Sequence, residues 1–314
     1  MRRTLRFLSH VLFFLVVLSA TLWALGAIWF HLHDRALIIG LWSTLAAACA
    51  ILALRFQRRA LSWTVLAVAV GVITGWYMSL SPRQDRDWAF DVARGATARI
   101  EGERVTLGNV RDFLWRSETS ASGGWRDITV DLGQITSVDL ITARAEAPAR
   151  TQSMVSFGFA DDQHLVFSLE PRRQKDQPYD DLAGAFRRYE LILIAATESD
   201  ILRHRAAILN DTLHLAPVDL APDQRRALFL AYAGLAQQLQ QTPAFYNSVL
   251  AKGPALLGPL SRVLAPGVPA DQAGLLSGRL PAVLGRPAPE TATVLAAAAT
   301  APAGPAYSRA IRAP

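Results

Sequence analysis

The chain has 314 residues, a net charge of +6 and an apolar fraction of 51%. This length accommodates a membrane region together with one soluble domain of ordinary size. Much of the positive charge flanks apolar N-terminal runs, and no basic stripe is interleaved with aromatic residues, so the composition gives no support for nucleic acid as a partner.

Three long apolar runs occupy the N-terminal region: Phe7–Phe30, Ala36–Leu54 and Leu61–Leu80. Each is close to the ~20 residues that a helix needs to cross a bilayer, so residues 1–81 are predicted to form three transmembrane helices in contact with membrane lipid. A cleaved signal peptide is the alternative for the first run. That run is long for a signal peptide, and two further runs follow it.

The arginines around these runs predict their orientation. Three arginines precede the first run and three lie between the second and third, whereas the loop between the first and second has one arginine beside an aspartate. By the positive-inside rule, the N-terminus faces the cytoplasm and the chain after Leu80 lies outside. We therefore expect a membrane protein whose C-terminal domain lies outside the cytoplasm.

The only cysteine, Cys49, lies inside the second apolar run. The domain outside the membrane therefore has no thiol nucleophile, no disulfide and no cysteine-based metal site. Its histidines are isolated in sequence, and neither a P-loop nor a dinucleotide-binding fingerprint is present. No metal and no cofactor are expected.

Residues 82–264 are predicted to form one α+β domain, because strand patterns come first and a long helix follows. Ala98–Leu107 alternates around a turn at Gly102, and "SMVSFGFADDQHLVFSLE" indicates a hairpin with its turn at residues 161–163. "YELILIAA" indicates a buried strand, and "APDQRRALFLAYAGLAQQLQQTP" indicates an amphipathic helix.

The C-terminal part of the chain gives weaker signals. A helix is expected to begin near Pro254, after the Lys252–Gly253 pair, because proline is favoured at the first helical position. Residues 265–314 are rich in alanine and proline and are predicted to be largely disordered, apart from a short helix at Leu275–Leu284.

Several segments, in this order, resemble one known family: "RDWAFDVAR", "IEGERVTLGNVRDFLWRSE", "MVSFGFADDQHLVFSLEPRR", "YDDLAGAFRRYELILIAATESDILRHR" and "PAFYNSVL". The set is similar to the Lnb-type N-terminal periplasmic domain family, from about Arg86 to Leu250. The resemblance implies a papain-like fold of the permuted NlpC type. Together with the preceding apolar runs, it implies a protein of the bacterial inner membrane whose C-terminal domain is periplasmic. It also implies, for some members, acyl transfer on lipoproteins by a cysteine thiolate paired with a histidine.

Both catalytic positions of that family differ here. The family strand carries a histidine four residues before a serine; "TQSMVSFGF" puts Ser156 at the serine and Gln152 at the histidine. Phe245–Asn247 match an F-Y-N motif, and counting onward puts Gly253 at the cysteine. Glutamine does not accept a proton at neutral pH, and glycine has no side chain.

The remaining matched positions are candidates to line a cleft, or to hold the fold together by ion pairs and hydrogen bonds. The cleft candidates are Ser156, Glu170, Arg172, Tyr189, Glu190, Tyr246 and Asn247. Further matched polar positions are Arg173, Tyr179, Arg187, Glu198 and Arg203.

Three functions remain open from the sequence. The first is a catalytically inactive binding or regulatory module for lipoproteins or other acylated ligands. The second is an active acyltransferase or hydrolase that uses a hydroxyl nucleophile, for which Ser153, Ser156 and Ser248 are the nearby groups. The third is a structural membrane subunit whose domain is a docking surface.

Overall fold

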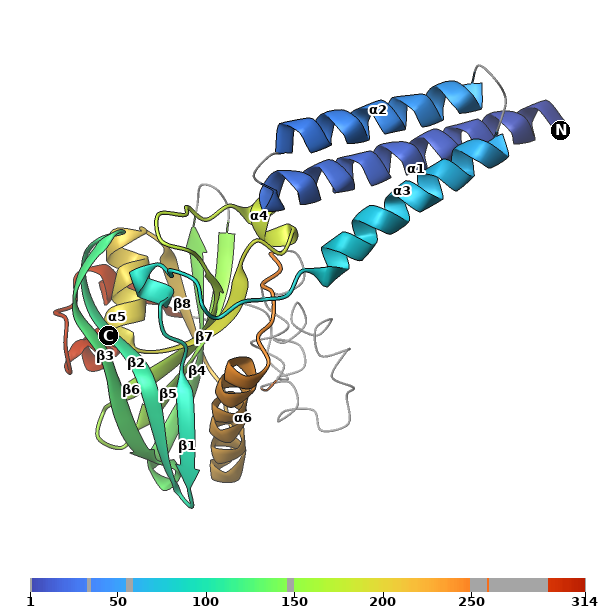
Figure 1. Ribbon diagram of the computed structural model, residues 1–314. Helices are drawn as coiled ribbons and strands as arrows, with labels where there is room; N and C mark the ends of the chain where they lie inside the picture. The colour runs from blue at the N-terminus through green and yellow to red at the C-terminus, as the bar shows by residue number, and fades with distance from the viewer. Residues whose placement is uncertain are drawn as a thin grey trace. The chain divides into compact units, whose positions relative to one another are not determined.

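The computed structural model describes residues 2–32, 35–54, 59–145, 150–248, 259 and 293–313 (Figure 1). The chain forms two compact units, Met1–Arg83 and Gln84–Pro314. The division falls close to residue 81, where the sequence predicts the membrane region to end.

The first unit consists of three helices: α1 (Arg2–His31), α2 (Arg35–Leu54) and α3 (Arg59–Ser79). Two segments are long and apolar enough to cross a membrane, Val11–His31 and Ala60–Ser79, and the apolar helix Arg35–Cys49 is shorter. The described residues therefore support two candidate spans, and the third predicted span stays a prediction.

The second unit is built on one nine-stranded sheet. Its order is β1-β2-β7-β6-β5-β4-β8-β9, with β3 paired to β2 outside this path. The strands are β1 (Thr97–Glu101), β2 (Arg104–Ser117), β3 (Ser120–Asp131), β4 (Ile135–Ala145), β5 (Arg150–Phe159), β6 (His164–Arg172), β7 (Glu190–Thr197), β8 (Thr212–Pro217) and β9 (Thr293–Val294). The β2–β7 pair is parallel and the other pairs are antiparallel, so the sheet is mixed and the predicted α+β class is confirmed.

One face of the sheet is covered by α6 (Pro222–Gln241), the predicted amphipathic helix. Proline occupies its first turn, and the Gln224 side chain accepts a hydrogen bond from the Ala221 N–H at 2.9 Å, which caps the helix start. Phe229 and Tyr232 of this helix pack on Phe157 and Phe167 of the sheet, with ring centroids 5.1 to 6.0 Å apart. These rings form the centre of the larger core.

The opposite face is covered by short elements. They are α5 (Glu198–Arg203), the π-helical turn η3 (His204–Ile208), η5 (Ala296–Ala299) and α10 (Tyr307–Arg312). Smaller elements complete the unit: η1 (Phe90–Val92), η2 (Leu132–Gln134) and α4 (Asp181–Ala185). A second core of aliphatic side chains, including Ile141, Met154, Ile194 and Leu202, lies between this layer and the sheet.

The predicted hairpin is formed by β5 and β6, with Val155 opposite Phe167 and Ser156 opposite Val166. Because side chains alternate along a strand, Val155 and Phe157 face α6, whereas Gln152, Met154 and Ser156 share the opposite face. Gly102 has a φ of +61° in the turn between β1 and β2, as its predicted turn position requires.

The C-terminal segment differs from the disordered tail expected from composition. Residues 293–313 are folded onto the second unit, and Leu295, Ala298, Tyr307 and Ile311 are buried there. These side chains are too few to form a core alone, but the sheet supplies the remaining apolar surface. The expected helices at Pro254 and at Leu275–Leu284 lie outside the described residues.

Candidate functional site

Gln152, which the resemblance puts at the family's histidine position, lies in a compact polar cluster on the sheet face away from α6. Gln152 is on β5, and its Nε2 donates to Ser168 Oγ at 2.7 Å and to Glu170 Oε1 at 2.6 Å, both on β6. Ser168 Oγ also donates to the same Glu170 oxygen, at 2.9 Å. The three side chains meet because the hairpin register brings residues 152, 168 and 170 to one face.

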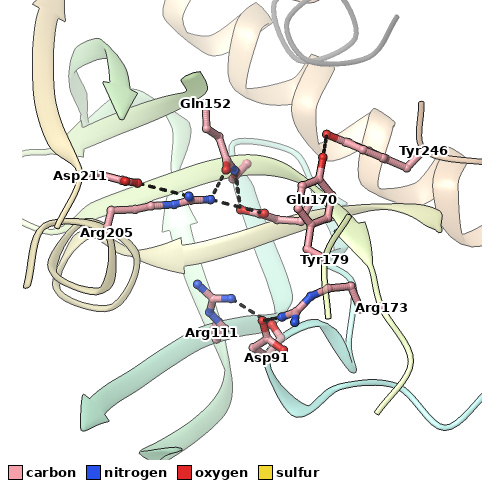
Figure 2. Close-up of polar contacts among 10 residues, drawn as sticks. Asp91, Arg111, Gln152, Glu170, Arg173, Tyr179, Arg205, Asp211 and Tyr246 are labelled. Carbon is pink, nitrogen blue, oxygen red and sulfur yellow. Dashed lines mark hydrogen bonds and ion pairs between the residues drawn. The ribbon is translucent and has the colours of Figure 1, made fainter. Parts of the chain in front are cut away.

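A cation completes this cluster from another element. Arg205 of η3 donates to Gln152 Oε1, and its Nη2 lies 3.7 Å from Glu170 Oε2. Its Nη1 lies 3.4 Å from Asp211, which precedes β8. Figure 2 shows Gln152, Glu170 and Arg205 directed toward one another. Both ends of the Gln152 amide are therefore engaged, and the charge of Glu170 is partly neutralised.

His204, the residue before Arg205, packs against an aromatic side chain of β2. Its ring stacks on Trp115 of β2, with centroids 3.8 Å apart and an interplanar angle of 20°. Burial, followed by the charges of Arg111, Arg205 and Arg173, lowers the pKa of His204 to about 3. A histidine with this pKa is neutral at physiological pH and is a weak base, so it does not replace the missing family histidine as a proton acceptor.

A buried carboxylate, that of Asp200, holds the β2 segment that carries Phe113 and Trp115. Asp200 of α5 accepts hydrogen bonds from Arg111 Nε at 3.0 Å, the Phe113 N–H at 2.9 Å and Trp115 Nε1 at 2.8 Å. Arg111 also donates to the Asp91 carbonyl oxygen at 2.9 Å, and Arg173 pairs with the Asp91 carboxylate at 2.5 Å (Figure 2). These contacts hold two arginines close to the polar cluster while each is paired.

A group of tyrosines lies on the other side of Glu170. Tyr246 is held by its N–H, which donates to the Tyr189 carbonyl oxygen at 2.9 Å, and its hydroxyl is 3.5 Å from that of Tyr179. Tyr179 donates to Asp181 at 2.7 Å. Burial raises the pKa of Tyr246, and the charges of Glu170 and Arg205 also act on it. Through Tyr179, the F-Y-N segment is thus linked to Asp181 of α4.

The other predicted residues separate into distinct structural roles. Arg172 donates to the carbonyl oxygens of Val92 and Ala93 and to Gln84 Oε1, and it lies over the Trp88 ring. Glu190 pairs with Arg86 at 3.5 Å. Tyr189 donates to the Pro178 carbonyl oxygen and accepts from the Asp180 N–H. These contacts hold residues 84–93 and 178–180 against the ends of β6 and β7.

The three candidate hydroxyl nucleophiles lie outside the Gln152 cluster. Ser156 is fully buried and donates to Glu198 Oε1 at 2.6 Å, and Ser248 donates to the Asp181 carbonyl oxygen at 2.5 Å. Ser153 is half-buried on β5, on the opposite face from Gln152. Asn247 follows Tyr246 directly, and Gly253 lies outside the described residues.

Of the predicted residues, the structure thus brings Gln152 and Glu170 into direct contact, and Tyr246 into contact with Tyr179. Sequence analysis did not single out Ser168, Arg205, Asp211 or Trp115. The alternation of Ser168 and Glu170 along β6 was a usable signal, because a hairpin register pairs them with Gln152. Arg205 and Asp211 gave no such signal, since a π-helical turn positions the arginine. Among the described residues, no group of three or more His, Cys, Asp or Glu side chains is arranged to hold a metal ion.

Comparison with known proteins agrees with the resemblance. Residues 122–276 match the family described as the Lnb N-terminal periplasmic domain. This range contains the β5–β6 hairpin, η3 and the F-Y-N segment, and therefore every member of the Gln152 cluster. No curated protein and no solved structure matches the chain.

Proposed function

Because the chain belongs, over residues 122–276, to the Lnb N-terminal periplasmic domain family, we propose that it is an inner-membrane protein whose periplasmic domain binds an acylated ligand, such as a lipoprotein, without transforming it. Its three N-terminal helices span the membrane, with the N-terminus in the cytoplasm. The arginine distribution around the apolar runs supports this orientation.

The observation that carries the proposal is the bonding of Gln152. In the family's chemistry, a thiolate is activated by a basic histidine at this position. Here an amide stands there, and Ser168, Glu170 and Arg205 engage both of its polar atoms. An amide does not take up the proton of a nucleophile, and the chain has one cysteine, Cys49, in α2.

The polar cluster has the character of a recognition site. Glu170 and Arg205 have side-chain exposures of 13% and 19%, so each retains a small contact with solvent. The exposed Leu182 of α4 provides apolar surface on the stretch that also holds Tyr179 and Asp181. Such a combination suits a ligand with a polar head and an apolar chain.

Binding of a synthetic lipopeptide to the full-length protein in lipid nanodiscs tests this function. We expect tighter binding of the diacylated or triacylated peptide than of the same peptide without acyl chains. Gln152→Ala removes the amide that hydrogen-bonds to both Arg205 and Glu170. We expect this change to weaken binding by about tenfold, which corresponds to about 1.4 kcal/mol.

Gln163→Ala is the matched control, because Gln163 lies in the turn of the same hairpin and its backbone makes the turn's hydrogen bonds. It is expected to bind as the unmodified protein does. Equal binding of acylated and unacylated peptides, or equal effects of the two substitutions, would contradict the proposal.

A further inference from the structure

The C-terminal segment, residues 293–313, occupies the face of the sheet that α6 leaves uncovered. Its strand β9 pairs with the edge strand β8, with Leu215 opposite Thr293, and the Leu295 N–H donates to the Leu213 carbonyl oxygen at 3.0 Å. Figure 1 shows this red segment beside α5. Leu295 and Ile311 are buried among aliphatic side chains of the sheet and α5.

At the end of this segment, Arg312 enters an acidic socket. Its Nη1 and Nη2 donate to the two oxygens of Glu198, both at 2.7 Å, and Nη2 also donates to Asp139 Oδ2 at 2.8 Å. Ser156 Oγ donates to Glu198 Oε1 at 2.6 Å from the floor of the socket. The Glu198 side chain has no exposed surface and that of Asp139 is 6% exposed.

The two carboxylates come from different elements, Asp139 from β4 and Glu198 from α5. Without a guanidinium, two buried negative charges would face each other across this socket, an arrangement that is strongly unfavourable. The fork of an arginine satisfies both oxygens of one carboxylate together with an oxygen of the second, and an ammonium group does not reproduce that geometry.

A second arginine on the same short helix provides a contrast. Arg309 pairs with Asp162, and these side chains are 76% and 58% exposed. An exposed ion pair of this kind contributes little to stability or affinity. The segment is therefore anchored by Arg312, by its buried apolar side chains and by the β8 edge.

We infer that the surface formed by the β8 edge and α5, together with the buried carboxylates of Glu198 and Asp139, is a peptide-docking site. Its occupant is the chain's own residues 293–313, which are recognised as an added strand, an apolar stretch and an arginine. This mode of recognition combines main-chain hydrogen bonds at a sheet edge with side-chain pockets. The segment is held by these contacts and does not require continuity of the chain through residues 249–292. This inference is independent of the function proposed for the Gln152 cluster.

Cleavage of the connecting chain tests the site with all its parts present. A specific protease sequence is inserted after Ser277 in the full-length protein, and the purified, assembled protein is cut in detergent and passed over a size-exclusion column. We expect the C-terminal fragment to remain with the rest of the chain. Loss of the fragment from the otherwise unmodified protein would overturn the inference.

Three labelled peptides covering residues 293–314, the unmodified sequence and its Arg309→Ala and Arg312→Ala variants, then test the socket without changing the protein. Each competes with the resident fragment of the cleaved protein. We expect the peptide with Arg309→Ala to exchange in as well as the unmodified peptide, and the peptide with Arg312→Ala to do so at least about tenfold less. Equal exchange of the two variants would refute Arg312 as the anchor. Exchange of no peptide, despite release of the fragment in urea, would refute a self-contained docking site.

Discussion

His204 makes a specific contribution to the pH dependence of stability. Its ring is stacked on Trp115, and burial together with three nearby arginines lowers its pKa to about 3. His204→Phe keeps an aromatic ring against Trp115 and removes the titrating group. It also removes Nε2, which has no hydrogen-bond partner among the described residues. At pH 7.5 we therefore expect this variant to be at least as stable as the unmodified protein.

The sign of the pH effect follows from the two pKa values of this histidine. In the unfolded chain its pKa is about 6.5, so it takes up a proton as the pH falls below that value. In the folded protein it stays neutral until a pH of about 3. Acidification therefore favours the unfolded state by about 1.4 kcal/mol per pH unit within this window, or about 2 kcal/mol between pH 7.5 and pH 5.

Urea unfolding of the full-length protein in detergent, followed by circular dichroism from pH 7.5 to pH 5, measures this difference. We expect the free energy of unfolding of His204→Phe to fall less than that of the unmodified protein, by about 2 kcal/mol over the range. Parallel profiles for the two proteins would refute a buried, neutral His204.

The remaining predictions concern the framework of the domain, and urea unfolding at pH 7.5 measures each unless another condition is stated. Asp200→Asn removes the charge that pairs with Arg111 and turns an acceptor of three hydrogen bonds into a mixed donor and acceptor. We expect the free energy of unfolding to fall by about 3–5 kcal/mol. A fall of less than about 1 kcal/mol would contradict this role. Gly123→Ala is expected to lower the free energy of unfolding by about 1–3 kcal/mol, because φ is +94° and a Cβ would lie 2.4 Å from the Asp112 carbonyl oxygen. Gly124→Ala is its control, since that position has open space around it, and it is expected to cost less. Arg312→Ala is expected to cost about 3–5 kcal/mol and Arg309→Ala about 0–1 kcal/mol. Although burial alone would raise the pKa of Glu198, the Arg312 guanidinium lowers it below the ordinary value. The stabilisation that the Glu198–Arg312 pair gives the folded state is therefore complete above a pH of about 4.3, and it is lost as the pH falls through the folded pKa of Glu198. The loss of unfolding free energy caused by Arg312→Ala should therefore shrink in acid. A loss that is constant with pH would contradict the pairing.

The elements that the sequence predicts well are those whose side chains alternate or repeat on one face. The β5–β6 hairpin, β7 and α6 each bury a regular set of apolar residues, and the pattern is visible without knowledge of the partner. The C-terminal segment has no such pattern. Its alanines and few large side chains become buried because β8, α5 and the Glu198 socket supply complementary surface, which a local reading of composition does not reveal.

The candidate site was predictable in part. The resemblance made Gln152, Glu170 and Tyr246 candidates for one site, and the hairpin alternation was sufficient to add Ser168. Arg205 depends on the geometry of η3, and its approach to Gln152 is a tertiary contact between segments 53 residues apart. Sequence periodicity does not encode a contact of that kind.

The proposal that this domain binds acylated ligands without transforming them is tested most directly by turnover. Full-length protein in detergent is incubated with diacylated and triacylated lipopeptides, and the products are followed by mass spectrometry over time. We expect the acyl chains to stay where they were, with no transfer or hydrolysis above a protein-free sample. Product that forms in proportion to protein concentration would contradict the proposal, and its persistence in Gln152→Ala would show that the domain acts by a different catalytic group.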